Sequence, residues 1–151
     1  MDIITFFKII SKINVFSDIA YNLKDMSAKN IGDFFEYLTK FLFLIHPFYS
    51  NSVSKIWLYK ELDDGLKKFL NIPDSDKGID IVIKMIDGKY CAVQCKYRTN
   101  EDDIISWKEL STFAGQMQVS GQFSKGYYVT NTYNINSEIK RAKNIITIYG
   151  T

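Results

Sequence analysis

The sequence is poor in the residues that mark several classes of protein. It has two prolines and eight glycines in 151 residues, too few for a collagen-like or low-complexity chain. Hydrophobic residues make up 46% of the chain and charged residues 24%, a composition that excludes a disordered protein. The length fits one domain with a single sizeable core.

Cysteine and histidine are also scarce, at Cys91, Cys95 and His46. The two cysteines fall in one expected strand, where four residues span roughly 13 Å at ~3.3 Å per residue. A disulfide needs Cα atoms within about 7 Å. We therefore expect free thiols and a reducing compartment, the cytoplasm. The same separation and the single histidine exclude a zinc site.

Charge of one sign is not in excess, with 19 basic and 17 acidic residues. This excludes binding of nucleic acid by bulk positive charge, but not an enzyme whose positive charge is local. The apolar N-terminal run is interrupted by Lys8 and Lys12, so we expect neither a signal peptide nor a membrane contact. We expect residues 1–29 to be a helical segment on a domain spanning residues 30–151. The two form a single globular unit, either minimal or excised from a larger protein.

Helical and extended patterns alternate along the chain. Apolar spacing predicts a helix over 30–45, ended before Pro47, and the S-x-x-E box at 106–109 predicts a helix over 107–119. Further elements are expected as strands at 55–59, 79–86, 89–97, 126–130 and 145–149, and as short helices near 66–70 and 137–143. This order predicts an α/β sandwich with a mixed central sheet.

The strongest local signal is a β-hairpin whose turn contains Asp87-Gly88. Its register decides whether Asp80 meets Gln94. A two-residue turn would pair Asp80 with Cys95, on the face away from Gln94 and Lys96. A three-residue loop with a left-handed glycine places Asp80 opposite Gln94. We predict the three-residue loop.

That register would gather groups suited to phosphodiester chemistry. The carboxylate of Asp80, the amide carbonyl of Gln94 and the backbone carbonyl of Cys95 are oxygen ligands of the kind that Mg²⁺ prefers, with Mn²⁺ expected to substitute. Lys96 adds a positive charge and three hydrogen-bond donors. Together they could polarise a phosphodiester and stabilise the charge of an in-line displacement.

A further acid would help, because Gln94 is neutral. Glu36, on the expected 30–45 helix, is our candidate for a further metal-binding and catalytic residue. An ion pair with Lys40, four residues on, would explain Glu36 without any function. Asp80 or Lys96 taken alone would also be structural more often than functional; only the combination favours a site.

The segment Gly78-Ile79-Asp80, followed after thirteen residues by Gln94-Cys95-Lys96, resembles the core of the PD-(D/E)XK nuclease superfamily in its D…QxK variant. It is similar to Mrr-like restriction endonucleases and to the nuclease domains of large helicase-containing enzymes of type ISP. Residues 32–38, 55–57, 105–110 and 128–131 also resemble family segments.

The resemblance implies a restriction-endonuclease-like α/β/α sandwich and Mg²⁺-dependent hydrolysis of DNA phosphodiesters. It implies a restriction or defence role, as the nuclease module of a larger helicase-containing enzyme. It places metal binding on Asp80, Gln94 and Glu36, and the catalytic lysine at Lys96.

A nuclease also needs a surface that follows the DNA backbone, and we expect Arg98, Lys89 and Lys108 to contact phosphates. No sequence-reading motif is visible, so a specificity or helicase domain would belong to the same or an associated protein. Two alternatives stay open: a structure-selective nuclease of the Holliday-junction type acting as a homodimer, and a catalytically weak DNA-binding or interaction domain of the same fold. The sequence does not separate DNA from RNA.

Overall fold

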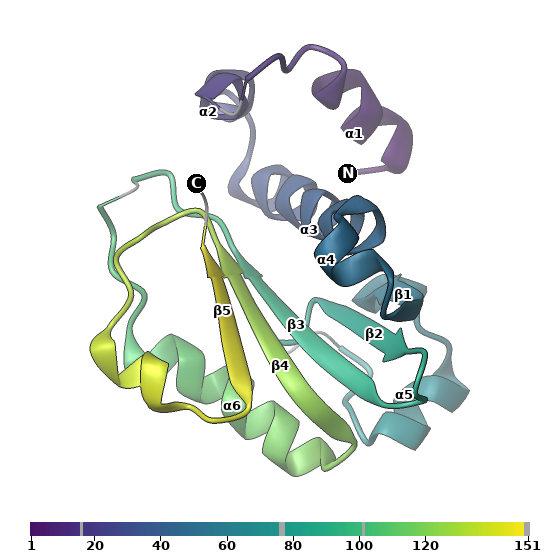
Figure 1. The fold of residues 1–151 in the computed structure, drawn as a ribbon. Coiled ribbons are helices and arrows are strands. Elements are labelled where there is room, and N and C mark those ends of the chain that lie inside the picture. The colour runs from purple at the N-terminus through teal and green to yellow at the C-terminus, as the bar shows by residue number, and fades with distance from the viewer. Residues whose placement is uncertain (16, 76–77, 101, 150–151) are drawn as a thin grey trace.

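A computed structural model describes residues 1–15, 17–75, 78–100 and 102–149 (Figure 1). The strands of this part are β1 (Val53–Leu58), β2 (Ile81–Met85), β3 (Tyr90–Lys96), β4 (Phe123–Thr130) and β5 (Ile145–Tyr149). The helices are α1 (Ile3–Ile10), α2 (Ser17–Leu23), α3 (Ala28–Ile45), α4 (Pro47–Ser50), α5 (Asp64–Leu70) and α6 (Trp107–Ser120), with 3₁₀ turns η1 (Tyr59–Glu61) and η2 (Ser137–Arg141).

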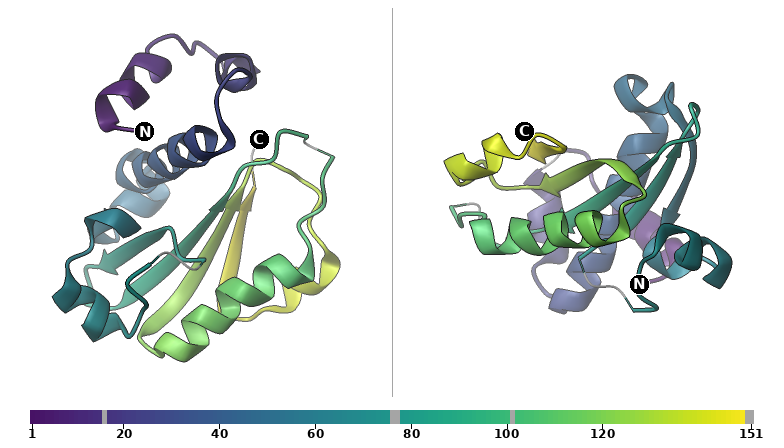
Figure 2. Two further views of the ribbon diagram at one scale, coloured as in Figure 1. Left: turned by 180° about the vertical axis from the view of Figure 1, so that it is seen from behind. Right: turned by 90° about the horizontal axis from the view of Figure 1, so that it is seen from below.

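The strands form one mixed sheet in the order β1-β2-β3-β4-β5. β2 runs antiparallel to both β1 and β3, whereas β3, β4 and β5 are parallel. Parallel neighbours need a crossover, and α6 provides it between β3 and β4. Helices lie on both faces of the sheet (Figure 2), so the predicted α/β/α sandwich is confirmed.

One layer is built on α3, whose apolar residues recur at helical spacing. Phe34, Phe35 and Phe43 are buried among sheet residues such as Ile81 and Val93. The helix begins two residues earlier than predicted, because the Ser27 hydroxyl accepts a hydrogen bond from the Asn30 amide and caps the helix there. The helix ends at Ile45, as predicted, two residues before Pro47.

The opposite layer is built on α6. Its residues Leu110, Phe113 and Met117 pack on Val82, Ala92 and Tyr128, which alternate with the residues facing α3. The predicted capping box at 106–109 is present in both directions and starts the helix at the expected residue.

The β2–β3 hairpin has the predicted three-residue loop. The amide of Met85 donates to the carbonyl of Lys89 at 2.8 Å, and Gly88 has φ +85°, the left-handed conformation that the loop requires. The register that follows pairs Ile81 with Val93 and brings Asp80 beside Gln94.

Differences from the sequence prediction fall at element ends and in short segments. The expected strand at 55–59 is β1, which starts at Val53 and gives way to η1 at Tyr59. The expected helix near 137–143 is only the 3₁₀ turn η2. Helices α2 and α4 were not predicted, because their few residues carry little periodicity.

The N-terminal segment shares the core of the α3 layer. Phe6 of α1 is 2% exposed, and its ring lies 5.3 Å from Phe34 and 5.5 Å from Phe41. Ile19 and Leu23 of α2 join the same cluster. None of the described helices is long and apolar enough to span a membrane.

The two cysteines are free thiols, as predicted. Both lie on β3, and Cys91 is buried against the α3 layer. Burial raises the pKa of its thiol, so Cys91 acts as a small apolar core residue rather than a nucleophile.

Candidate functional site

Asp80 lies directly before β2 and is fixed by backbone hydrogen bonds on both sides. Its amide donates to the carbonyl of Val93 on β3, and its carbonyl accepts from the amide of Tyr59 after β1, both at 2.8 Å. Asp80 is 7% exposed. The start of β2 is therefore rigidly held between its two neighbouring strands, which limits the directions in which the carboxylate can point.

The side chain of Asp80 contacts the two residues on β3 that the sequence places with it. Oδ2 of Asp80 accepts a hydrogen bond from the backbone N–H of Cys95 at 2.6 Å and from Nε2 of Gln94 at 3.2 Å. The N–H and C=O of one strand residue point to the same side. The carbonyl of Cys95 is therefore directed toward the side of β3 on which Asp80 lies.

Gly78 closes the other side of Gln94. Its φ is +94°, and a Cβ at this position would lie 3.2 Å from Oε1 of Gln94 and 3.6 Å from Cγ2 of Thr112 on α6. A side chain there would strain the backbone and crowd the amide. Thr112 was not singled out in the sequence. The one available signal was its helical spacing, three residues after Glu109.

Lys96 is the last residue of β3 and is half-buried. It shares the α6 face of the strand with Gln94, because residues two apart on a strand point the same way. Its strand partner is Thr130, the last residue of β4. The structure therefore brings Asp80, Gln94 and Lys96 together where β3 and β4 end.

These residues offer oxygen atoms suited to a hard cation: the carboxylate of Asp80, the amide of Gln94 after a turn of its end group, and the carbonyl of Cys95. Within the described ranges, no group of three histidine, cysteine, aspartate or glutamate side chains comes together. Mg²⁺ is usually held by one or two carboxylates, with water and substrate phosphate completing its shell. The donor set therefore fits Mg²⁺ or Mn²⁺ bound together with a phosphodiester.

Glu36 lies on α3, in the layer opposite α6. It lines a cavity of about 320 Å³ together with Tyr59 and with charged residues that include Lys67. Tyr59 is the residue whose amide binds the carbonyl of Asp80, so this cavity adjoins the Asp80 segment, although Asp80 does not line it. Lys40, the residue that could pair with Glu36 on the same helix, bonds to Glu61 at 2.6 Å.

Arg98 follows Lys96 on the same face and forms an ion pair with Glu109 in the first turn of α6. Burial opposes ionisation of Glu109, but hydrogen bonds from the amide and hydroxyl of Ser106 and from Arg98 outweigh it and lower the pKa of the carboxyl. Burial, with Glu109 nearby, also raises the pKa of the Tyr128 hydroxyl. The Arg98 guanidinium is thus engaged with protein.

The two lysines expected to bind DNA lie in different places. Lys108 is an exposed residue in the first turn of α6, near the Arg98–Glu109 pair. Lys89 is at the hairpin loop, where it pairs with Asp87 at 3.1 Å. Lys96 is seven residues further along the chain, roughly 23 Å away at ~3.3 Å per residue.

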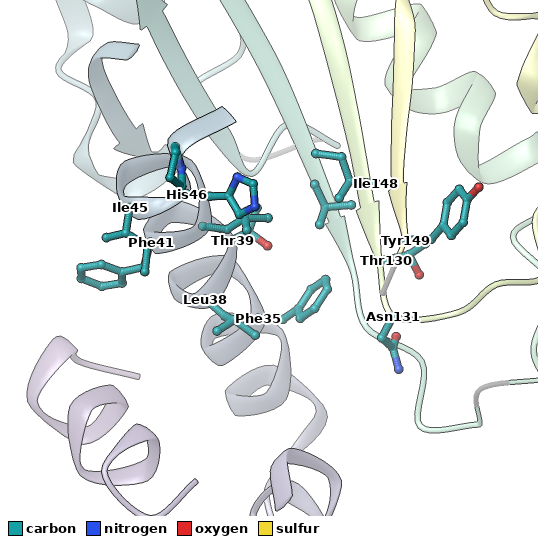
Figure 3. A pocket seen from close by; sticks show the side chains of 13 residues that line it. Phe35, Leu38, Thr39, Phe41, Ile45, His46, Thr130, Asn131, Ile148 and Tyr149 are labelled. Carbon is teal, nitrogen blue, oxygen red and sulfur yellow. The ribbon is translucent and has the colours of Figure 1, made fainter. Parts of the chain in front are cut away.

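A cavity of about 540 Å³ lies elsewhere, between α3 and the strands β4 and β5 (Figure 3). Its lining is largely apolar, including Phe35, Leu38 and Ile148, and none of Asp80, Gln94 and Lys96 contributes to it. A hollow of this composition does not suit a polyanionic substrate.

The fold and the site agree with a comparison to protein families. Residues 44–148, more than half of the chain, match the model of an Mrr-like catalytic family described as a restriction endonuclease. The chain belongs to the restriction endonuclease family. It is therefore a nuclease domain of the restriction type, and the matched residues include Asp80, Gln94 and Lys96.

A solved structure resembles this restriction endonuclease domain. It is that of the ATP-dependent type ISP restriction-modification enzyme LlaBIII bound to DNA, with a TM-score of 0.68 and 21% sequence identity. The similarity covers 91% of this chain and 8% of the LlaBIII chain. At this identity the likeness establishes the fold. No curated protein matches the chain significantly.

Proposed function

We propose that this chain is a divalent-metal-dependent endodeoxyribonuclease that hydrolyses DNA phosphodiesters, with Asp80, Gln94 and Lys96 as its catalytic residues. The observation that carries the proposal is the contact of Asp80 with Gln94 and with the amide of Cys95, on the strand that ends in Lys96. The likeness to a type ISP enzyme supports work within a larger helicase-containing protein.

Asp80 and Gln94, with the carbonyl of Cys95, would hold the metal ion, and Glu36 from α3 is the further acid we propose. The bound cation supplies Lewis-acid polarisation of the phosphodiester and a more acidic water. The ammonium of Lys96 would bind a non-bridging phosphate oxygen and stabilise the charge that develops there. Asp80 is pre-positioned for its role by its two backbone hydrogen bonds.

The test is cleavage of supercoiled plasmid with Mg²⁺ or Mn²⁺, comparing the wild type with Lys96→Ala. Metal-dependent nicking or linearisation that the variant loses would support the proposal. Lys125→Ala, an exposed lysine at the far end of β4, is the matched control and should cut as the wild type does. Cleavage that survives in Lys96→Ala would contradict the role given to Lys96.

Binding of the metal can be measured without cleavage. A ligand that binds only the native state raises its melting temperature, so Mg²⁺ or Mn²⁺ should stabilise the wild type and Lys96→Ala but not Asp80→Ala. Stabilisation without cleavage would indicate a nuclease that needs its helicase or another partner. Neither stabilisation nor cleavage would favour the catalytically weak DNA-binding domain.

A further inference from the structure

The position of Lys96 depends on what happens just beyond the end of the sheet. The last backbone pair between β3 and β4 is Lys96 with Thr130. After it the two segments leave the sheet, at Tyr97 and at Asn131. A lysine at the last rung of a ladder would have a loosely held backbone on one side unless something continued the pairing.

Asn131 continues it with its side chain. Oδ1 of Asn131 accepts from the amide of Arg98 at 2.6 Å, and Nδ2 donates to the carbonyl of the same residue at 2.8 Å. One carboxamide thus satisfies both backbone groups of Arg98, as a neighbouring strand would. Asn131 is 7% exposed, so water does not replace these bonds at little cost.

The residue that Asn131 holds is anchored a second time through its side chain. Arg98 pairs with Glu109, which also binds the amide and hydroxyl of Ser106 at the start of α6. Residue 98 is therefore tied to β4 through its backbone and to α6 through its guanidinium. Lys96, the last residue of β3, lies two residues before this anchor.

We propose that Asn131 is a positioning residue for the catalytic lysine. Its carboxamide extends the β3–β4 ladder past Lys96 and fixes the backbone that carries this side chain on the same face of β3 as Gln94. The inference rests on the proposed function of Lys96. Asn131 itself lines the apolar cavity (Figure 3), which Asp80 does not line, and its carboxamide bonds the backbone of Arg98, so it acts through the backbone and not on the substrate.

Asparagine is the side chain that fits this task. Aspartate would keep the acceptor for the amide of Arg98 but lose the donor, and alanine would lose both. A displacement of a catalytic group by about 1 Å costs about a hundredfold in rate. Loss of the clamp should therefore lower the rate of the chemical step while leaving substrate affinity and metal binding intact.

The experiment compares Asn131→Ala and Asn131→Asp with Asn134→Ala in the full chain, at a temperature below all melting transitions. Asn134 is the matched control, because its exposed side chain also bonds the facing loop, at the carbonyl of Asp102, but further from Lys96. Single-turnover cleavage of plasmid gives the rate, its dependence on DNA concentration gives KM, and the melting temperature with and without Mg²⁺ reports the metal site.

We expect kcat of Asn131→Ala to fall about tenfold to a hundredfold with KM within about twofold of the wild type. The kcat of Asn131→Asp should lie between that of Asn131→Ala and that of the wild type. Asn134→Ala should cut as the wild type does. The Mg²⁺-induced rise in melting temperature should be unchanged in all three variants. Partial rescue by aspartate, together with the split between kcat and KM, is a pattern that general loss of stability does not produce.

Two results would overturn the inference alone. One is wild-type kcat in Asn131→Ala while Lys96→Ala is inactive, and the other is a rise in KM with unchanged kcat. In both cases the nuclease assignment stands. A wild-type chain that neither cuts DNA nor gains stability from Mg²⁺ would overturn the proposed function, and the role of Asn131 with it.

Discussion

The amide of Gln94 donates to Oδ2 of Asp80 at 3.2 Å, so a neutral side chain stands beside the carboxylate of Asp80. The carboxylate of Asp80 accepts hydrogen bonds from this amide and from the backbone N–H of Cys95. With glutamine at residue 94, the residues beside Asp80 carry less negative charge than they would with glutamate. Affinity for hard cations rises with the number of charged ligands, so glutamine should lower the affinity for the cation.

Replacing Gln94 by glutamate should therefore have opposite effects with and without metal. Two adjacent carboxylates repel each other, so Gln94→Glu should melt at a lower temperature than the wild type in EDTA at neutral pH. With Mg²⁺ the added charge should tighten binding about tenfold, or about 1.4 kcal/mol. Titration of the melting temperature with Mg²⁺ measures both effects.

Gln94→Met is the control for this change, because it keeps the length of the side chain without charge or oxygen. It should lose part of the Mg²⁺-induced stabilisation. Equal Mg²⁺ affinities of all three proteins would mean that residue 94 does not contact the cation.

A second prediction concerns Gly78, where φ is +94° and an added Cβ would lie 3.2 Å from Oε1 of Gln94. Gly78→Ala should lower the free energy of unfolding by about 1–3 kcal/mol through backbone strain and should also weaken the Mg²⁺-induced stabilisation. Gly88→Ala separates the two effects, because Gly88 has a similar φ of +85° with nothing within 4 Å of its Cβ. Gly88→Ala should lower the free energy of unfolding but leave the Mg²⁺-induced stabilisation unchanged. The same metal response in both variants would remove Gly78 from the site.

Most of the fold could be predicted because its elements carry strong local signals. The capping box at 106–109, the proline after α3 and the alternation in β2 and β3 each fix an element with little help from the rest of the chain. The three-residue loop followed from asking which register lets Asp80 meet Gln94. Short elements such as α4 and η1 are decided by packing, which a sequence pattern does not reveal.

The site could be predicted only where its residues belong to neighbouring strands. Asp80, Gln94 and Lys96 follow from the hairpin register, whereas the placement of Glu36 depends on how α3 lies across the sheet. The role of Asn131 depends on its contact with Arg98, 33 residues earlier in the chain, and that of Arg98 on its contact with Glu109, 11 residues later. Arg98 looks like a DNA contact in the sequence, but its guanidinium is paired with Glu109.

The Arg98–Glu109 pair predicts a dependence of stability on pH. The pKa of Glu109 is lowered from its usual 4.5 in the folded protein, so its ionised form contributes stability that is fully present above about pH 5 and is lost as pH falls through the folded-state pKa. The melting temperature of the wild type should exceed that of Glu109→Gln near neutral pH, and the difference should shrink below pH 4.5.

Glu138→Gln, at an exposed residue, is the control for this series and should track the wild type across the range. A difference between the wild type and Glu109→Gln that stays constant from pH 7 to about pH 3 would mean that packing, and not ionisation, accounts for the effect of Glu109.

The last prediction distinguishes the two lysines expected to bind DNA. Lys108 is exposed at the start of α6, close to the anchor of Lys96, whereas Lys89 is paired with Asp87 roughly 23 Å along β3. If DNA lies over the ends of β3 and β4, Lys108→Ala should weaken binding uniformly across sequences and reduce the slope of log affinity against log salt by about 1. Lys89→Ala should change the slope less, because its ammonium already has a partner and lies away from the site. Affinities of both variants for one duplex at several salt concentrations test this, and a larger effect at Lys89 would place the DNA along the hairpin instead.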